Sequence, residues 1–121
     1  NLVSGKGKAA GNIFIYHFKV EKSQVLGKYS YNLVLLQGGE KINDFQGTLA
    51  FTAHLWQDGK KVKMPIITED STKKFNLKFK IYHRAEGSFE VLPDTVVEAL
   101  EVKVYENGKR NAKSMRLVNL S

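Results

Sequence analysis

Bulky apolar side chains recur at every second residue through long stretches of this chain. The alternating residues of the four clearest segments are Phe14, Tyr16, Phe18 and Val20; Tyr29, Tyr31, Leu33 and Leu35; Phe45, Leu49, Phe51, Ala53 and Leu55; and Phe75, Leu77, Phe79 and Ile81. A period of two places these side chains on one face of a pleated strand, whereas a helix would scatter them around its circumference. The pattern therefore predicts β-strands that face a common core. The core residues that we expect to meet are Leu33, Leu35, Phe51, Phe79 and Val102.

Turn-forming residues divide the chain into about eight strands. The expected strands are residues 13–22, 29–37, 45–57, 60–67, 75–83, 88–92, 100–105 and 112–119. Asp58-Gly59 and Asn107-Gly108 are strong hairpin signals, because Asp, Asn and Gly tolerate positive φ angles. We also expect a turn at Glu86-Gly87 and a polar loop over residues 68–73.

Two residues qualify individual strands. Pro65 has no N–H to donate, which predicts that its strand lies at a sheet edge or at a bulge. Gly47 near the start of its strand indicates a bulge or a bend. Residues 95–100 fit either one helical turn or an extended strand. Together these features predict an all-β fold, an antiparallel β-sandwich of immunoglobulin or fibronectin type.

Length and composition indicate one domain. The chain has 121 residues, and residues 1–12, rich in glycine and small side chains, predict a flexible linker before a single sandwich domain over residues 13–121. The chain has no cysteine, so disulfides, thiolate chemistry and cysteine-based zinc sites are excluded, and the compartment stays open. No signal peptide or membrane-spanning run is visible. The first residue is Asn rather than Met, which suggests that an upstream part has been removed.

The chain is basic, with 19 Lys and Arg against 12 Asp and Glu and a formal charge of +7. Such a charge favours anionic partners, and strands in which cations alternate with aromatics can bind a nucleic-acid strand. The candidate binding residues form one row of the expected strand 75–83 and its flank, namely Lys74, Lys78, Lys80 and Tyr82. One exposed aromatic is little support for a nucleic-acid site, so we favour a solvated, edge-protecting face.

Residues that could carry catalysis are scattered. The three histidines, His17, His54 and His83, lie in different expected strands, and their spacing does not predict a metal site. The aspartates at expected turns, where Asp bonds its own backbone, are Asp44, Asp58, Asp70 and Asp94. A hydrolase would need a nucleophile with a base positioned beside it or two facing carboxylates, and the turn positions explain these aspartates without such chemistry. We therefore expect a protein that is not an enzyme and that uses no metal or cofactor.

Several segments together resemble an uncharacterised family of Gram-negative bacterial proteins, which is known only as a domain of unknown function. The matching segments, in order, are residues 2–4, 11–15, 29–37, 57–59, 75–82, 86–87 and 92–93. The most specific is the second strand, in which Tyr29 and Tyr31 alternate with polar residues before the strand ends in Leu36-Gln37. The resemblance covers nearly the whole chain.

The resemblance implies an architecture and a compartment. Members of the family carry one transmembrane helix, a long coiled coil and a C-terminal β domain similar to this one. The chain is then the periplasmic head of an inner-membrane protein, attached to the membrane only through a missing upstream anchor and able to self-associate through the missing coiled coil. The expected function is non-enzymatic interaction or scaffolding with other envelope proteins, and the alternative is a basic β domain that binds nucleic acid or another polyanion.

Overall fold

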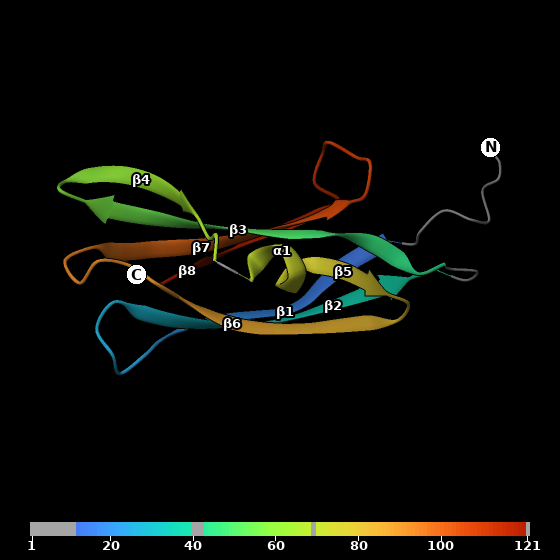
Figure 1. The fold of residues 1–121 in the computed structure, drawn as a ribbon, viewed down its shortest axis with the longest axis horizontal. Coiled ribbons are helices and arrows are strands. Elements are labelled where there is room, and N and C mark those ends of the chain that lie inside the picture. Colours follow the sequence, from blue (N-terminus) through green and yellow to red (C-terminus); the bar gives the residue numbers. More distant parts are fainter. Residues whose placement is uncertain (1–11, 40–42, 69, 121) are drawn as a thin grey trace.

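The computed structural model describes residues 12–39, 43–68 and 70–120. Within these ranges the chain forms eight strands and one helical turn, arranged in two layers (Figure 1). The elements are β1 (Asn12–Lys22), β2 (Lys28–Gly38), β3 (Phe45–Gln57), β4 (Lys60–Pro65), α1 (Ser71–Lys74), β5 (Asn76–Phe79), β6 (Tyr82–Glu90), β7 (Val96–Glu106) and β8 (Ser114–Asn119). The predicted linker lies outside the described residues except for Asn12, which begins β1.

The strands form two antiparallel sheets. The first has the order β1-β2-β6 and the second the order β4-β3-β7-β8, with β5 also paired to β3. In an immunoglobulin domain, strands A, B and E share one sheet with D, and C, F and G form the other. Here β1, β2 and β6 take the places of A, B and E, while β3, β7 and β8 take those of C, F and G. The predicted sandwich is therefore confirmed, and no described strand stands at position D beside β6.

The core lies between the two sheets and contains the residues that the alternation predicted. Leu33, Leu35, Phe51, Phe79 and Val102 are all buried. The ring of Phe51 lies at its centre, with centroid distances of 4.4 Å to Tyr31, 5.2 Å to Phe75 and 6.1 Å to Phe18. Burial of these large side chains on both inner faces is the main force holding the two sheets together.

The prediction for β1 was partly wrong. Phe14 and Tyr16 were expected to face the core with Phe18, but both are exposed, and Ile13 and Ile15 are buried instead. The cause is a β-bulge: the register with β2 shifts between Ile15 and His17, so one extra residue reverses the faces of the strand. Phe18 and Val20 then point inwards as predicted.

The prediction for residues 75–92 was also partly wrong. Strand β5 ends at Phe79, the chain crosses to the other sheet, and Ile81 is exposed rather than on an apolar strand face. Glu86 and Gly87 lie in the middle of β6, where they pair with Asn32 and Tyr31, so they do not form a turn. The expected short strand over residues 88–92 is the second half of β6 and the residues after it.

Turn predictions fared better. Asp58 and Gly59 join β3 to β4 with φ angles of 52° and 74°, as a tight hairpin requires. Pro65 ends β4, which is an edge strand as predicted. Gly47 pairs in regular register, and the register shift between β3 and β7 falls at His54 and Leu55, where Glu98 of β7 is the extra residue. Residues 96–100 are extended within β7, and the expected loop over residues 68–73 contains most of α1.

Candidate interaction surface

The four residues predicted as one basic row are divided between three elements and the connection between two of them. Lys74 ends α1, Lys78 lies in β5, Lys80 lies in the crossing between the sheets, and Tyr82 begins β6. All four side chains are exposed. A Cβ on Gly87 would lie 2.7 Å from Lys74 Nζ, so the Lys74 side chain reaches across to β6. Because the chain changes sheet after Phe79, the expected continuous face of one strand does not exist.

Tyr82 belongs instead to an apolar row on the outer face of the three-stranded sheet. Phe14 in β1 pairs with Leu36 in β2, and Leu36 pairs with Tyr82 in β6, so the three side chains cross the sheet side by side. Phe14 is 53% exposed and Tyr82 62%. Tyr16, the neighbouring aromatic in the bulged part of β1, is 70% exposed. We call Phe14, Tyr16, Leu36 and Tyr82 the aromatic patch.

Local geometry explains how this row forms. The bulge after Ile15 is what leaves Phe14 and Tyr16 outside while the rest of β1 packs on the core. Gly38 has no side chain, and a Cβ there would lie only 3.0 Å from the Phe14 ring, so the ring can lie over the end of β2. Sequence alternation missed the patch because a bulge leaves no clear signature in the spacing of apolar residues.

Charge around the aromatic patch is of one sign. The next cross-strand row contains His17, Val34 and Arg84, and Lys80 lies two residues before Tyr82. None of residues 12–17, 34–38 and 80–84 is Asp or Glu. Burial lowers the pKa of His83, which lies under this end of the sheet with its ring 5.7 Å from that of Phe79. The patch is thus an apolar surface with a cationic border.

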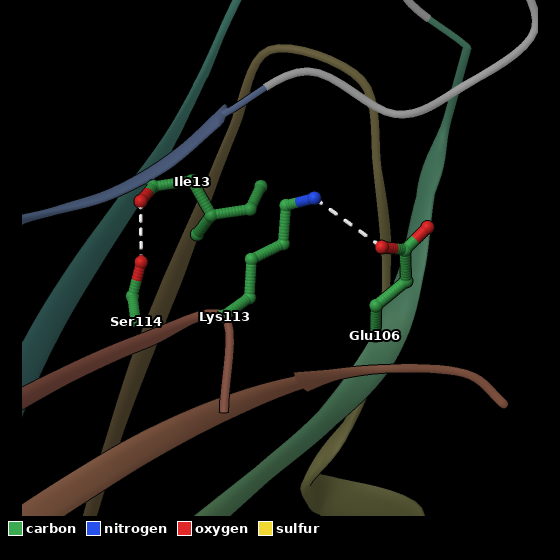
Figure 2. Close-up of polar contacts among 4 residues, drawn as sticks. All are labelled: Ile13, Glu106, Lys113 and Ser114. Carbon is green, nitrogen blue, oxygen red and sulfur yellow. Dashed lines mark hydrogen bonds and ion pairs between the residues drawn. The ribbon is translucent and has the colours of Figure 1, made fainter. Parts of the chain in front are cut away.

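Further cations lie in the loop between β7 and β8. Lys109, Arg110 and Lys113 line a small surface hollow of about 240 Å³ with Glu106, and Lys113 Nζ lies 3.2 Å from Glu106 Oε1 (Figure 2). The Ser114 hydroxyl donates a hydrogen bond to the Ile13 carbonyl oxygen, which ties β8 to β1 across the two sheets (Figure 2). This loop and the crossing after β5 lie toward the end of the sandwich where β1 begins (Figure 1).

The outer face of the five-stranded sheet carries a cluster of polar side chains, one of which lacks a hydrogen-bond partner. His54 Nε2 lies 3.7 Å from Glu101 Oε1 and has no hydrogen-bond partner. Trp56 Nε1 donates to Glu98 Oε2, and Lys61 Nζ lies 5.4 Å from the centre of the Trp56 ring. Among the described residues no His, Asp or Glu side chains gather in a group that could hold a metal ion.

The opposite end of the sandwich contains another hollow. Its volume is about 540 Å³, and it lies between the β1–β2 turn and the connection from β6 to β7. Its walls are mainly apolar, with Leu26, Pro93 and Val97, and its polar residues include Lys22, Asp94 and Thr95. The Thr95 hydroxyl is buried and has no hydrogen-bond partner, but it is closed off from the surface.

Comparison with known proteins identifies a family but no function. Among the described residues, no helix is long and apolar enough to cross a membrane. No curated protein and no solved structure matches the chain significantly. A family model does match, over residues 1–104, which is most of the chain. The chain therefore belongs to a family of unknown function (DUF6776), in agreement with the resemblance found in its sequence.

Proposed function

We propose that this chain is a non-enzymatic protein-interaction or scaffolding domain and that its aromatic patch is the binding surface. The observation that carries the proposal is the row Phe14, Leu36 and Tyr82, in which large apolar side chains cross an outer sheet face while the core is already filled. Exposed apolar patches of this kind on folded domains mark contact surfaces, because leaving them in water is unfavourable. Aromatic residues are also enriched at the centres of protein interfaces.

The chemistry of the patch border defines the partner. Arg84 lies in the row next to the patch and Lys80 lies two residues before Tyr82, and no carboxylate lies in the same segments. A partner surface that is apolar at its centre and acidic at its rim would match it, since charge at the rim sets orientation and association rate. We place this partner in the cell envelope and the domain on the periplasmic side of the inner membrane, following the architecture that the family resemblance implies.

Site-specific crosslinking in cells tests this proposal. A photocrosslinking residue at Tyr82 should capture one defined envelope protein, and the same residue at Leu117, an exposed apolar position on the other sheet, should not. The purified partner should then bind the wild-type domain and lose most of its affinity for the double variant Tyr16→Ser, Tyr82→Ser. The matched control is Met115→Ser with Leu117→Ser. Equal binding to both double variants would contradict the proposal.

A second candidate function has its own observation. The β7–β8 loop, which contains Lys109, Arg110 and Lys113, and the crossing after β5, which contains Lys80, lie toward the same end of the sandwich (Figure 1). A positive field of this kind attracts polyanions. For nucleic-acid binding, the logarithm of the binding constant falls linearly with the logarithm of the salt concentration, and the slope reports the number of phosphates contacted. This function would be favoured over the first if the chain binds a single-stranded oligonucleotide with an affinity that falls steeply as salt rises, and if the double variant Lys109→Glu, Arg110→Glu abolishes that binding.

A further inference from the structure

The outer edge of β6 is an unpaired strand edge. β6 is nine residues long and pairs with β2 on one side, and no described strand pairs with its other side. In an immunoglobulin sheet strand D would stand there, but β5, which precedes β6 in the chain, pairs with β3 in the other sheet. In Figure 1 β6 runs along the full length of the three-stranded sheet.

Hydrogen bonds at the two ends of β6 show which backbone groups face outwards. The N–H of Val91 donates to the carbonyl oxygen of Gly27 (2.8 Å), and that of Gln37 donates to the carbonyl oxygen of Ile81 (2.9 Å). In an antiparallel pair, hydrogen-bonded positions alternate with positions whose backbone groups point away. The odd-numbered residues of β6 therefore bond to β2. Arg84, Glu86 and Ser88 direct their N–H and C=O groups toward the unpaired edge.

The edges formed by β1 and β4 carry features that discourage strand addition. β1 has a bulge after Ile15, and the Ser114 hydroxyl of β8 bonds to the Ile13 carbonyl oxygen. β4 ends in Pro65 and carries three lysines, at positions 60, 61 and 63. β6 contains no proline and no lysine, and its register with β2 is unbroken from Lys28 to Leu36. Bulges, proline and lysine are among the usual protections, so β6 is more open to strand addition than β1 or β4.

The charges along this edge complement a second copy of the same edge. Arg84, Glu86 and Glu90 are exposed, and none of them forms an ion pair within the described part of the chain. In a two-fold antiparallel pair whose outward groups bond to each other, one register sets Arg84 opposite Glu90 of the second copy and Glu86 opposite Ser88. Both carboxylates then have a cation or a hydroxyl opposite them. The register that sets Glu86 against itself is disfavoured, because like charges directly opposite destabilise a sheet.

We propose that two copies of this chain pair through β6, with Arg84 of each copy opposite Glu90 of the other. The two three-stranded sheets then form one continuous sheet, and the contact is isologous, as a two-fold dimer requires. Tyr82 stays outside the paired segment, so the aromatic patches of both copies remain open on the same outer face. This inference does not depend on the proposed function, since it concerns the purified chain alone.

The first test removes one outward N–H from the edge. Ser88→Pro deletes a donor that faces away from β2, whereas Ser88→Ala keeps it and serves as the matched control. Sedimentation equilibrium of the 121-residue chain should show a monomer–dimer equilibrium that Ser88→Pro weakens by roughly tenfold or more, because both copies lose a hydrogen bond. Amide exchange at Arg84, Glu86 and Ser88 should slow as concentration rises, while exchange at Ala85 and Gly87 should not change.

The second test does not depend on the folding of the proline variant. Arg84→Glu and Glu90→Arg should each weaken the dimer, and an equimolar mixture of the two should restore it, because every ion pair is then rebuilt between unlike copies. Restoration by Glu86→Arg in place of Glu90→Arg would overturn the register. A chain that stays monomeric at about millimolar concentration, or a dimer that Ser88→Pro leaves intact, would overturn the proposal. The proposal would also be overturned if the amides of Arg84, Glu86 and Ser88 became protected only when a different protein binds, and not when the concentration of the chain alone is raised.

Discussion

Gly87 lies opposite Tyr31 in the β2–β6 pair, so close that a Cβ on Gly87 would stand 2.6 Å from the Tyr31 phenolic oxygen. The same Cβ would stand 2.7 Å from Lys74 Nζ. Tyr31 cannot easily move away, since its ring is buried and its centroid lies 4.4 Å from that of Phe51. Glycine in the middle of β6 therefore provides space for a core tyrosine, as is common where a strand approaches its neighbours closely.

Gly87→Ala should lower the free energy of unfolding by about 1–3 kcal/mol, the usual cost of forcing an extra group into a packed site. Urea unfolding followed by the fluorescence of Trp56, the one tryptophan of the chain, measures this change. Ser88→Ala, at the next position on the outer face, should change stability by less than about 0.5 kcal/mol. If Gly87→Ala is as stable as the wild type, the side chain of Tyr31 can move to accommodate the added methyl group, which would contradict the tight packing described here.

Tyr31 should also make the fold sensitive to alkali. Burial, together with the negative charge of Asp70, raises the pKa of Tyr31 to about 12. In the unfolded chain a tyrosine ionises near 10, so above that pH the unfolded state binds fewer protons than the folded state. Stability should therefore fall as pH rises from about 10 towards 12.

Absorbance at 295 nm checks this directly. The titration of the folded chain should contain a tyrosine step near pH 12, and Tyr31→Phe should remove that step. The same variant should flatten the decline of stability with pH. A wild-type titration that lacks a step near pH 12, or one in which Tyr31→Phe leaves that step in place, would count against the buried environment described for Tyr31.

Alternation of apolar residues was sufficient to predict the sandwich but not every strand face. Leu33 and Leu35 lie in β2, where buried and less buried residues alternate without a break, so a period of two determines burial without help from the rest of the fold. β1 differs because Ile13 and Ile15 compete with Phe14 and Tyr16 for the inner face, and the bulge that decides between them depends on packing against the second sheet. Local sequence therefore left this choice open.

The candidate surface was less predictable for a related reason. Residues 75–83 alternate as one strand would, but the chain changes sheet after Phe79, which separates Lys78 from Tyr82. The position of such a crossing depends on which strand edges are free to pair in the folded molecule. The alternation of apolar and polar residues continues through the crossing unchanged, so the sequence does not mark it. The aromatic patch combines three strands, so it could be found only once their register was known.

In the turn between β3 and β4, stability should be sensitive to substitution of Gly59. Gly59 has a φ angle of 74°, and an L-residue pays about 1–2 kcal/mol in the left-handed region. Gly59→Ala should lower stability by that amount, although a Cβ there would meet no other atom within 4 Å. Asp58→Asn, with φ of 52°, should be tolerated, because Asn adopts this conformation readily. Equal effects of the two substitutions in urea unfolding would contradict the turn assignment.

The bulge in β1 makes a prediction opposite to the one that alternation alone would make. Ile15 is buried at 6% exposure, so Ile15→Ala should cost about 2–5 kcal/mol, as expected when a large core side chain is truncated. Phe14→Ala removes a larger side chain, but one that lies outside, and should cost less than about 1 kcal/mol. If Phe14 shared the inner face with Phe18, the order of the two costs would be reversed. Urea unfolding of both variants under one set of conditions thus tests the strand face on which the aromatic patch depends.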